Sequence, residues 1–287
     1  MSTRLKLAIQ KKGRLSEKSL ELLKLCGFDY DLSGERLLVS IKNFDLDILF
    51  LRDDDIPEYV QDGVADIGIV GEDVLFEANM EIDVIKKMGF AGCTLMIALP
   101  ENSPINTPAD LSGKRVATSH IRILEDYFKR EGINAKAITL SGSVEIAPGL
   151  GIADAICDIV STGTTLRMNK LKPAFPVFKS EAVLIGTKNL ENDVQKSELM
   201  RELLLRVDSV LTAKNSKYIM MNVPKNSIEK VLGFLPALSS PTILSLADPS
   251  MLAVQTVIPA KEFWKIAPDL KQAGATGILL LSIENIV

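Results

Sequence analysis

The chain has 287 residues, which is too long for one small module and allows about two domains, or three if one is small. Hydrophobic residues make up 47% and charged residues 24%, and the mean hydropathy is +0.19, so the composition excludes disorder as the main state. The net charge is −4 and the pI is near 5.3. No overall positive field therefore attracts nucleic acid or anionic lipid, and any anionic ligand must be held by local groups.

Cysteine and histidine are sparse. Cys26, Cys93 and Cys157 are isolated from one another, a pattern that indicates a reducing compartment rather than a disulfide framework. His120 is the only histidine and no C-x-x-C pair occurs, so a zinc site is not expected. The first residues are basic without an apolar signal segment, and no apolar run approaches the ~18 residues of a membrane helix. We therefore expect a cytoplasmic protein that neither binds nucleic acid nor spans a membrane.

Short apolar segments and amphipathic segments alternate along the first 140 residues. Ser16 is the expected N-cap of the first helix, with Leu15 and Leu20 at the staple positions and Gly27 as C-cap. A short helix begins at 56–57 and Gly63 closes it. Strands are predicted at 5–9, 37–41, 46–51, 65–70, 94–99, 114–118 and 135–140, and a third helix at 119–130. This alternation predicts an α/β fold with a mostly parallel sheet.

Two stretches of the chain resemble each other. Gly63-Val64-Ala65-Asp66 leads into a buried strand and a glycine turn, and so does Gly151-Ile152-Ala153-Asp154. Helix–glycine–strand steps are common in α/β proteins, so chance is one explanation. The other is two similar lobes facing each other across a cleft, each presenting strand carboxyl ends and helix amino ends to a ligand.

The last third of the chain predicts a separate unit. Residues 197–211 form an amphipathic helix with apolar residues at a 3.6-residue period. From Lys217 onward the order is strand, helix, strand, strand, helix, strand. This βαββαβ order fits a ferredoxin-like module. A small-molecule regulatory domain and a plain dimerisation module fit the pattern equally well.

The most informative stretch is 158–166, where an apolar strand runs into hydroxyl residues around one glycine at the expected start of a helix. Backbone N–H groups, the helix dipole and hydroxyl donors all suit a phosphate monoester. Each hydrogen bond to a charged oxygen contributes about 1.5–3 kcal/mol, so a few of them hold a phosphate without a lysine. A Walker loop is excluded because no Gly-Lys-Ser/Thr follows. A hydroxyl-rich cap of a buried helix is the alternative.

Residues 154–166, Asp-Ala-Ile-Cys-Asp-Ile-Val-Ser-Thr-Gly-Thr-Thr-Leu, closely resemble the phosphoribosyl-pyrophosphate-binding signature of the ATP phosphoribosyltransferases, which catalyse the first step of histidine biosynthesis. Further blocks resemble this family in the family's order, at 10–15, 52–57, 113–119, 142–148 and 216–221. The resemblance covers nearly the whole chain. The C-terminal module makes the chain similar to the long form, which carries its own histidine-feedback domain.

The resemblance implies a bilobal catalytic part like that of periplasmic solute-binding proteins, with substrates in the interlobe cleft. Lobe I would comprise residues 1–92 and 183–212, lobe II residues 93–182, and the regulatory domain residues 213–287. The implied reaction, a glycosyl transfer, joins N1 of the adenine of ATP to C1 of the ribose of phosphoribosyl pyrophosphate and releases pyrophosphate. Because the ribosyl carbon passes through an oxocarbenium-like state, the protein must neutralise the leaving charge and align the nucleophile.

The resemblance also implies site residues. Ser161, Thr162, Gly163, Thr164 and Thr165 would hold the 5′-phosphate of phosphoribosyl pyrophosphate. Asp158 and Glu145 would lie near the ribose hydroxyls or a Mg²⁺ ion, the expected cofactor, bound partly through the pyrophosphate. Cations aimed at the pyrophosphate and the ATP phosphates would be Lys11, Arg14, Arg52 and Arg115. The implied catalytic set is Arg14, Arg52, Glu145 and Asp158. For each cation the alternative is a solvated surface group.

His120 occupies a position where members of this family are expected to carry a tyrosine followed by proline. We predict that it lines the nucleotide pocket, and a helix-start histidine without a role is the alternative. Asp53, Asp54 and Asp55 would point to opposite faces if they lay on a strand, so we interpret them chiefly as a turn that starts a helix, with a metal role for one of them as the alternative.

The positions that match the family's histidine pocket are Asn222, Thr242, Val257 and Gly277. Asn222 stands where the family has an aspartate, and therefore offers an amino group only a neutral acceptor. The resemblance implies histidine and AMP as inhibitors and a homo-oligomer, a dimer or hexamer. A cytoplasmic bilobal small-molecule-binding or nucleotide-sensing protein without turnover is the alternative function.

Overall fold

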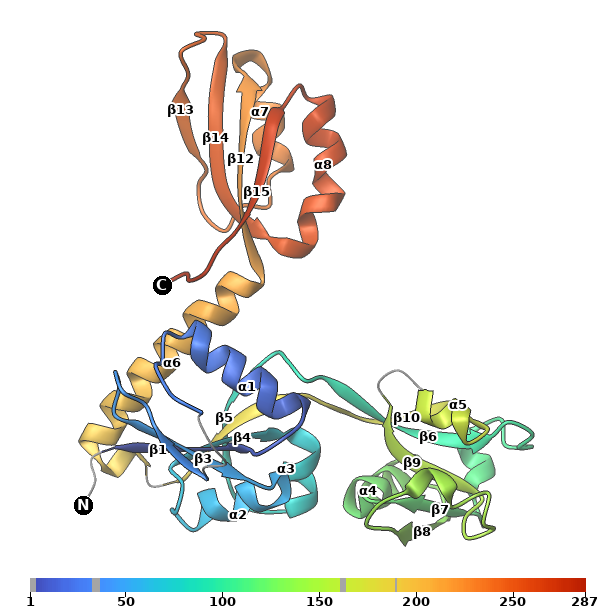
Figure 1. The fold of residues 1–287 in the computed structure, drawn as a ribbon. Helices are drawn as coiled ribbons and strands as arrows, with labels where there is room; N and C mark the ends of the chain where they lie inside the picture. The colour runs from blue at the N-terminus through green and yellow to red at the C-terminus, as the bar shows by residue number, and fades with distance from the viewer. Residues whose placement is uncertain (1–3, 33–36, 161–163, 189) are drawn as a thin grey trace. The chain divides into compact units, whose positions relative to one another are not determined.

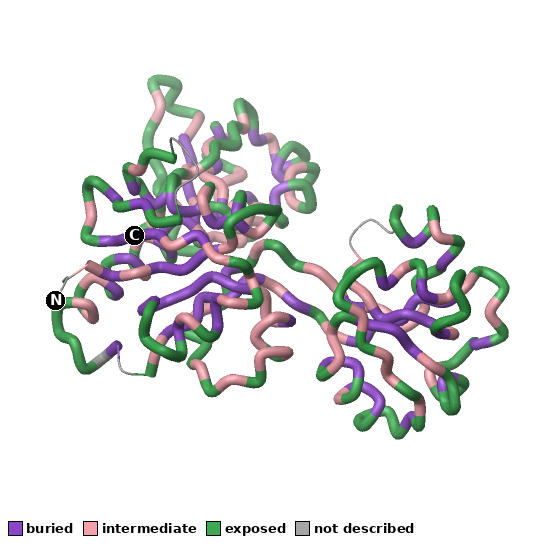
Figure 2. The backbone as a smooth tube through the Cα atoms, turned by 60° about the horizontal axis from the view of Figure 1, so that its bottom comes forward, coloured by how far each residue is buried: buried purple, intermediate pink, exposed green. Residues whose placement is uncertain are grey.

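The computed structural model describes residues 4–32, 37–160, 164–188 and 190–287. The chain forms two compact units (Figure 1). Unit 1 comprises Met1–Glu21 and Phe28–Leu199, and unit 2 comprises Leu22–Gly27 and Met200–Val287. Unit 1 holds two sheets, each the centre of a lobe, and unit 2 holds one. Buried residues follow the strands and exposed residues follow many of the connecting loops (Figure 2).

Lobe I is built on six strands in the order β2-β3-β1-β4-β11-β5. These strands are β1 (Leu5–Gln10), β2 (Leu38–Ser40), β3 (Leu46–Leu51), β4 (Ile67–Gly71), β5 (Asp83–Lys87) and β11 (Ala182–Gly186). The helices before β5 are α1 (Arg14–Leu25), α2 (Ile56–Gln61) and α3 (Glu72–Ala78). β1 is parallel to β3 and β4, so the carboxyl ends of the three strands meet at one edge.

Lobe II is built on five strands in the order β10-β6-β9-β7-β8. They are β6 (Cys93–Pro100), β7 (Arg115–Thr118), β8 (Lys136–Thr139), β9 (Ala155–Val160) and β10 (Leu171–Ser180). The helices are α4 (Ile121–Glu131) and α5 (Thr164–Met168). Helix α4 buries Ile123, Leu124, Tyr127 and Phe128 in a core shared with β6, β7 and β9. The chain crosses between the lobes before β6 and again between β10 and β11.

Unit 2 has the predicted βαββαβ order. After α6 (Val194–Lys214) come β12 (Ser216–Pro224), α7 (Ile228–Phe234), β13 (Thr242–Ser245), β14 (Met251–Pro259), α8 (Phe263–Gln272) and β15 (Thr276–Ser282). The strands are antiparallel in the order β13-β14-β12-β15, the ferredoxin-like arrangement, and α7 and α8 contribute to a core with one face. In the parts of the chain that the structure describes, no helix is long and apolar enough to cross a bilayer.

The two-lobed α/β architecture with a C-terminal βαββαβ module is confirmed, but the prediction of mostly parallel sheets is wrong. β1 with β3 and β4, and β7 with β8 and β9, are parallel pairs. The antiparallel pairs are β2–β3, β4–β11, β5–β11, β6–β9 and β6–β10. The reason is that the chain leaves lobe I through β6 and returns through β10 and β11, which add strands of opposite direction to both sheets.

The first helix begins earlier than predicted. Helix α1 starts at Arg14, and the N–H of Glu17 already donates to the carbonyl of Gly13 at 3.1 Å. Ser16 therefore lies inside the first turn, where it is buried, and is not the N-cap. Gly27 follows the helix with its N–H donating to the carbonyl of Lys24, as expected of a C-cap glycine. The earlier start places Arg14 at the first helical position, next to the carboxyl end of β1.

Gly68 allows α2 to pack closely on β4. A Cβ atom at Gly68 would lie 2.7 Å from Cγ2 of Ile56 and 3.1 Å from Cγ2 of Val60, both buried residues of α2. Gly68→Ala is therefore expected to lower the stability of lobe I by about 1–3 kcal/mol through overpacking. Hydrogen exchange of the β4 amides measures this loss. Gly142→Ala is the control, because a Cβ there would meet open space; equal loss in the two variants would contradict the packing argument.

Candidate active site

A cavity of about 510 Å³ lies between the two lobes of unit 1. Lobe I lines it with residues that follow the carboxyl ends of β1, β3 and β4, and the crossing segments and lobe II close the remainder. Its polar lining includes Arg14, Asp53, Asp73, Cys93 and Ser180, and Ile159 comes from lobe II. This edge, where parallel strands end and helices begin, is the usual ligand-binding edge of an α/β sheet.

The lobe I side of the cavity carries two cations, Arg14 and Lys18, and Lys18 is paired with Glu21. Arg14 is exposed, and no hydrogen bond or ion pair joins its guanidinium to another residue in the described part of the chain. Lys11 and Arg52 are also exposed and follow the carboxyl ends of β1 and β3 directly. The structure therefore brings three of the predicted cations to one edge of lobe I, although only Arg14 lines the cavity itself.

The acidic run after β3 forms a 3₁₀ turn, Asp53–Asp55, that leads directly into α2. This confirms its interpretation as a turn that starts a helix. The side chain of Asp53 accepts a hydrogen bond from Nε2 of Gln10 at 3.0 Å, which joins the ends of β1 and β3 at the cavity wall. Burial and the charges of Asp53 and Asp55 raise the pKa of Asp54.

On lobe II, Asp158 lies near the end of β9 and Glu145 lies in a 3₁₀ turn, Val144–Ile146. Oδ1 of Asp158 accepts the N–H of Ile159 at 2.8 Å. Burial raises the pKa of Asp158, and the negative charge of Glu145 raises it further. The two carboxylates are therefore close enough to interact. In the described parts of the chain, no three His, Cys, Asp or Glu side chains are grouped as a metal site.

The predicted phosphate loop is only partly described. Ser161, Thr162 and Gly163 lie outside the described residues. Thr164 and Thr165 are the first two residues of α5 and are exposed, whereas Leu166 is buried. The described hydroxyls thus follow the carboxyl end of β9, on the edge that also carries Asp158.

Arg115 does not lie near the carboxyl end of β9, where Asp158 and the described hydroxyls are. It lies at the amino end of β7, where its Nη2 is 3.2 Å from Oδ1 of Asp154 and its Nη1 donates to the carbonyl of Gly151 at 3.0 Å. The hydrogen bonds from Arg115 lower the pKa of Asp154. These bonds give Arg115 a structural role at the amino edge of the lobe II sheet, and its nucleotide-binding role stays a prediction.

The internal resemblance has a structural cause. Asp66 accepts the N–H of Lys6 at 2.8 Å and donates its own N–H to the carbonyl of Lys6, which joins β4 to β1. Asp154 makes the same pair of bonds to Arg115 and joins β9 to β7. Each aspartate also has a cationic partner, Lys196 at 2.7 Å for Asp66 and Arg115 for Asp154. The repeated motif thus marks equivalent strand pairs in two similar lobes.

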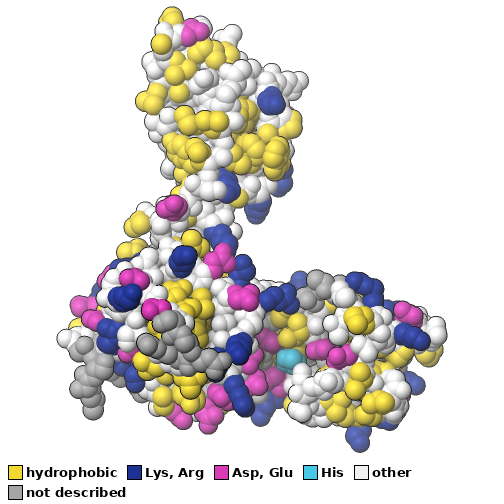
Figure 3. All heavy atoms as spheres, viewed as in Figure 1, with side chains coloured by type: hydrophobic (Ala, Val, Ile, Leu, Met, Phe, Trp, Pro, Cys, Tyr) yellow, Lys and Arg dark blue, Asp and Glu magenta, His cyan; other side chains and the backbone are white. Residues whose placement is uncertain are grey.

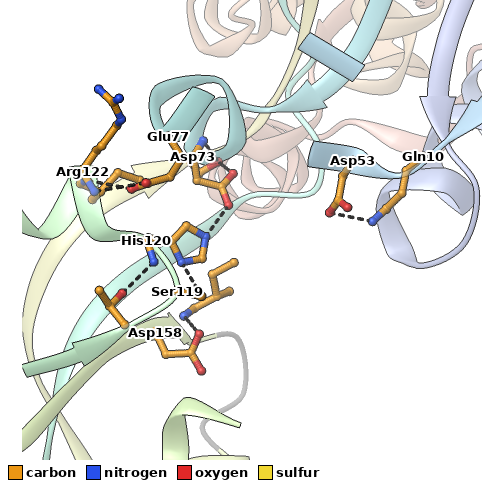
Figure 4. A network of polar contacts seen from close by, with 12 residues as sticks. Gln10, Asp53, Asp73, Glu77, Ser119, His120, Arg122 and Asp158 are labelled. Atoms are coloured by element: carbon orange, nitrogen blue, oxygen red, sulfur yellow. Dashed lines mark hydrogen bonds and ion pairs between the residues drawn. The ribbon is translucent and has the colours of Figure 1, made fainter. Parts of the chain in front are cut away.

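His120 meets a buried carboxylate of the other lobe (Figure 4). It is the residue before α4, and its Nε2 lies 3.5 Å from Oδ2 of Asp73 in α3, with side-chain exposures of 14% and 8%. The other oxygen of Asp73 accepts a hydrogen bond from Oγ of Ser180 at 2.6 Å. Nδ1 of His120 lies 3.0 Å from Oγ of Ser119. Figure 3 shows this single histidine with acidic side chains beside it. His120 is not among the residues that line the cavity, and its place in the nucleotide pocket stays a prediction.

Electrostatic interactions favour the charged form of both His120 and Asp73. Burial would lower the pKa of His120, but the hydrogen bond with Asp73 and the charges of Asp73, Glu77 and Asp158 outweigh burial and raise it. Burial would likewise raise the pKa of Asp73, but its bonds with His120 and Ser180 outweigh that effect and lower it. Sequence reasoning missed Asp73 and Ser180. The available signal was an aspartate two residues after the glycine that ends a buried strand.

Two family models match the chain. The one for ATP phosphoribosyltransferase matches residues 52–209, and the one for the HisG C-terminal domain matches residues 213–285. The ATP phosphoribosyltransferase of Cytophaga hutchinsonii is 48% identical over 287 residues, and both chains are covered completely. The chain belongs to the ATP phosphoribosyltransferase family.

Two further family members extend the comparison. The ATP phosphoribosyltransferase of Bacteroides thetaiotaomicron is 44% identical over 283 residues, with 99% of each chain covered. A solved structure, the ATP phosphoribosyl transferase (HisG:HisZ) complex from Thermotoga maritima, contains a chain that is 30% identical with a TM-score of 0.58. That match covers 71% of this chain and 98% of the other.

The predicted regulatory residues of this family member share one face of the unit 2 sheet. Alternation along the strands places Asn222, Thr242, Val257 and Gly277 on the face opposite α7 and α8. Asn222 and Gly277 adjoin, since a Cβ on the glycine would lie 3.6 Å from Nδ2 of Asn222. Thr242 and Val257 lie further along, where Thr242 pairs with Gln255. Asn222 and Gly277 thus lie toward one end of β12, whereas Val257 pairs with Tyr218 toward its other end.

The pKa of His120 can be measured without ambiguity, because it is the only histidine. In a protein without a histidine tag, an NMR titration of the imidazole C–H signal is expected to give a pKa above the ordinary 6.5. Because the folded-state pKa is raised, the contact contributes fully to stability below the unfolded-state pKa and is lost as pH rises through the folded-state value. Asp73→Asn should lower this pKa, and a native value at or below 6.5 would contradict the contact.

Proposed function

We propose that the interlobe cavity of unit 1 is the site of phosphoribosyl transfer from phosphoribosyl pyrophosphate to N1 of the adenine of ATP, the first step of histidine biosynthesis. The observation that carries this proposal is the juxtaposition, at one cavity, of Arg14 from lobe I and Ile159 from lobe II. The Arg14 guanidinium has no hydrogen-bond or ion-pair partner among the described residues, and Ile159 lies on β9, the strand that also bears Asp158. Family membership supplies the substrates. The cavity would let a cation from lobe I and a carboxylate from lobe II approach one substrate from two sides.

The residues of this chain would act by binding and alignment. Arg14, with Lys11 and Arg52 nearby, would bind the pyrophosphate and ATP phosphates and stabilise the negative charge that develops as the C1–O bond breaks. Asp158 would accept hydrogen bonds from the ribose hydroxyls. Thr164 and Thr165, with Ser161, Thr162 and Gly163, would hold the 5′-phosphate. No covalent nucleophile is required, because N1 of adenine attacks C1 as the pyrophosphate leaves.

We further propose Mg²⁺ as the cofactor. Asp158 and Glu145 fit it, because they are two interacting, partly exposed carboxylates, and Mg²⁺ in such sites is held by one or two carboxylates together with substrate phosphates. When bound, the ion would offset the charge of the pyrophosphate. The absence of a third acidic partner in the described residues agrees with coordination partly through the substrate.

The direct test is turnover. Purified protein mixed with ATP, phosphoribosyl pyrophosphate and Mg²⁺ is expected to give the ultraviolet absorbance change of phosphoribosyl-ATP and to release pyrophosphate. A protein that binds both substrates without releasing pyrophosphate would support the alternative, a bilobal small-molecule-binding protein without turnover.

Arg14 and Arg115 give a matched pair of variants. Arg14→Gln is expected to lower kcat/KM by about 10²-fold, since it removes a cation that acts on the developing charge, and to leave the melting temperature unchanged. Arg115→Gln is expected to lower the melting temperature slightly and to change kcat/KM less than about threefold, because its partner is Asp154. Steady-state kinetics and calorimetry measure both. The reverse pattern would return Arg115 to the substrate site and remove Arg14.

For unit 2 we propose a histidine-binding regulatory domain, with Asn222, Thr242, Val257 and Gly277 in the site, in a homo-oligomer in which a second chain complements the open face. AMP inhibition is part of the same proposal.

We also propose that lobe I comprises residues 1–92 and 183–212, that lobe II comprises residues 93–182, and that the protein is cytoplasmic. Burial raises the pKa of Cys26 and Cys157 to about 12, which keeps these free thiols unreactive and suits a reducing compartment.

Asn222→Asp tests the regulatory site. A carboxylate accepts a stronger hydrogen bond from an ammonium group than an amide does, so histidine is expected to bind about tenfold more tightly. Titration calorimetry on the full-length protein measures the change. Asn226→Asp, the same substitution at an exposed position between β12 and α7, is the control. Equal effects of the two variants, or histidine that competes with ATP, would contradict the assignment.

A further inference from the structure

Helix α3 of lobe I presents three side chains to lobe II. Asp73 meets His120, Phe76 meets Phe178 of β10 with ring centroids 5.5 Å apart, and Glu77 meets the start of α4. Positions i, i+3 and i+4 share one face of a helix, so a single short helix makes all three contacts. We propose that Asp73 and Glu77 form an interlobe clasp that positions lobe II for the transfer step. This inference rests on the proposed function of the cavity.

The Glu77 half of the clasp is a helix cap supplied from the other lobe. One carboxylate oxygen of Glu77 accepts the N–H of Ile123 at 2.8 Å, and the other accepts the N–H of Arg122 at 3.1 Å (Figure 4). Both amides belong to the first turn of α4, which has no partner for them within the helix. The negative charge also lies at the positive end of the helix dipole. The N-terminal cap of lobe II's main helix therefore belongs to lobe I.

The Asp73 half is anchored where the chain returns from lobe II. Ser180 ends β10, and its Oγ both donates to Oδ1 of Asp73 and accepts the N–H of Asp73 at 3.1 Å. Gly71 leaves room for this carboxylate, because a Cβ there would overlap Oδ1 of Asp73. The same carboxylate thus holds the crossing segment with one oxygen and the histidine of lobe II with the other.

The position of the clasp relates it to catalysis. Asp73 lines the substrate cavity, and beyond Phe76 the helices α3 and α4 border a separate groove of about 690 Å³. Arg14 and Asp158 belong to different lobes, so the distance between the groups that hold the two substrates depends on how the lobes are oriented. Misplacement by about 1 Å can cost about 10²-fold in rate. Glu77 lies outside the cavity lining and acts as a positioning residue, and Asp73 holds lobe II from the cavity wall.

Glu77→Gln and Asp73→Asn test the clasp, with Glu58→Gln as control, an exposed glutamate of α2 in the same lobe. Spin labels at Asp62→Cys and Lys136→Cys, one exposed position in each lobe, on a Cys93→Ser background, report the interlobe distance without substrates. Because Cys93 lines the cavity, kcat and KM are measured in unlabelled chains that keep Cys93. We expect both clasp variants to lengthen or broaden the distance distribution. We also expect kcat to fall about 10- to 100-fold with KM for each substrate within about threefold, and no change in the control.

Unchanged distances with unchanged kcat in Glu77→Gln would overturn the clasp. So would a fall in kcat with native distances, or a change in KM alone, because each of these results points to substrate contact rather than positioning. If Asp73→Asn does not fold, the more exposed Glu77 decides the matter alone. If the native chain shows no turnover, the proposed function fails, and the distance distributions still decide whether the clasp exists.

Discussion

The placement of lobe II against lobe I in unit 1 depends on the interactions of one buried carboxylate, that of Asp73. A carboxylate with 8% side-chain exposure is costly unless hydrogen bonds and an opposite charge satisfy it. Ser180 and His120 supply both, one from the crossing between the lobes and one from lobe II. The lowered pKa of Asp73 and the raised pKa of His120 have the same origin, because each group favours the charged form of the other. The cavity wall, the segment that crosses between the lobes and lobe II all meet at the Asp73 carboxylate.

An acidic chain can bind strongly anionic substrates only through local groups. The net charge of −4 gives no long-range attraction, and three of the predicted substrate-binding cations follow the carboxyl ends of β1 and β3 in lobe I. Lobe II contributes carboxylates, Asp158 and Glu145, on its own edge. This division of charge suits a substrate with a pyrophosphate at one end of a ribose and hydroxyls beside it. It also makes the relative placement of the lobes part of the chemistry.

The local sequence pattern predicted most strands and helices, but not which of them pair or pack together. Alternation of apolar segments predicted β1, β3, β4, β7 and β9, and the repeated glycine-aspartate motif predicted two similar lobes, because Asp66 and Asp154 perform the same task within their own sheets. The antiparallel strands and the contact of His120 with Asp73 join residues far apart in sequence, for which no short-range signal exists. Arg115 shows a second reason why a site residue is hard to place from sequence. A matching motif identifies the charged residue, but the direction of its strand decides at which edge of the sheet the residue lies.

The most direct measurement is a crystal structure of the chain with phosphoribosyl pyrophosphate and Mg²⁺ bound. The account predicts that the pyrophosphate lies in the interlobe cavity beside Arg14, with the ribose hydroxyls in hydrogen-bond distance of Asp158 and with His120 still against Asp73. Density for the sugar only in the groove between α3 and α4, or with the cavity empty and Arg14 directed to solvent, would contradict it.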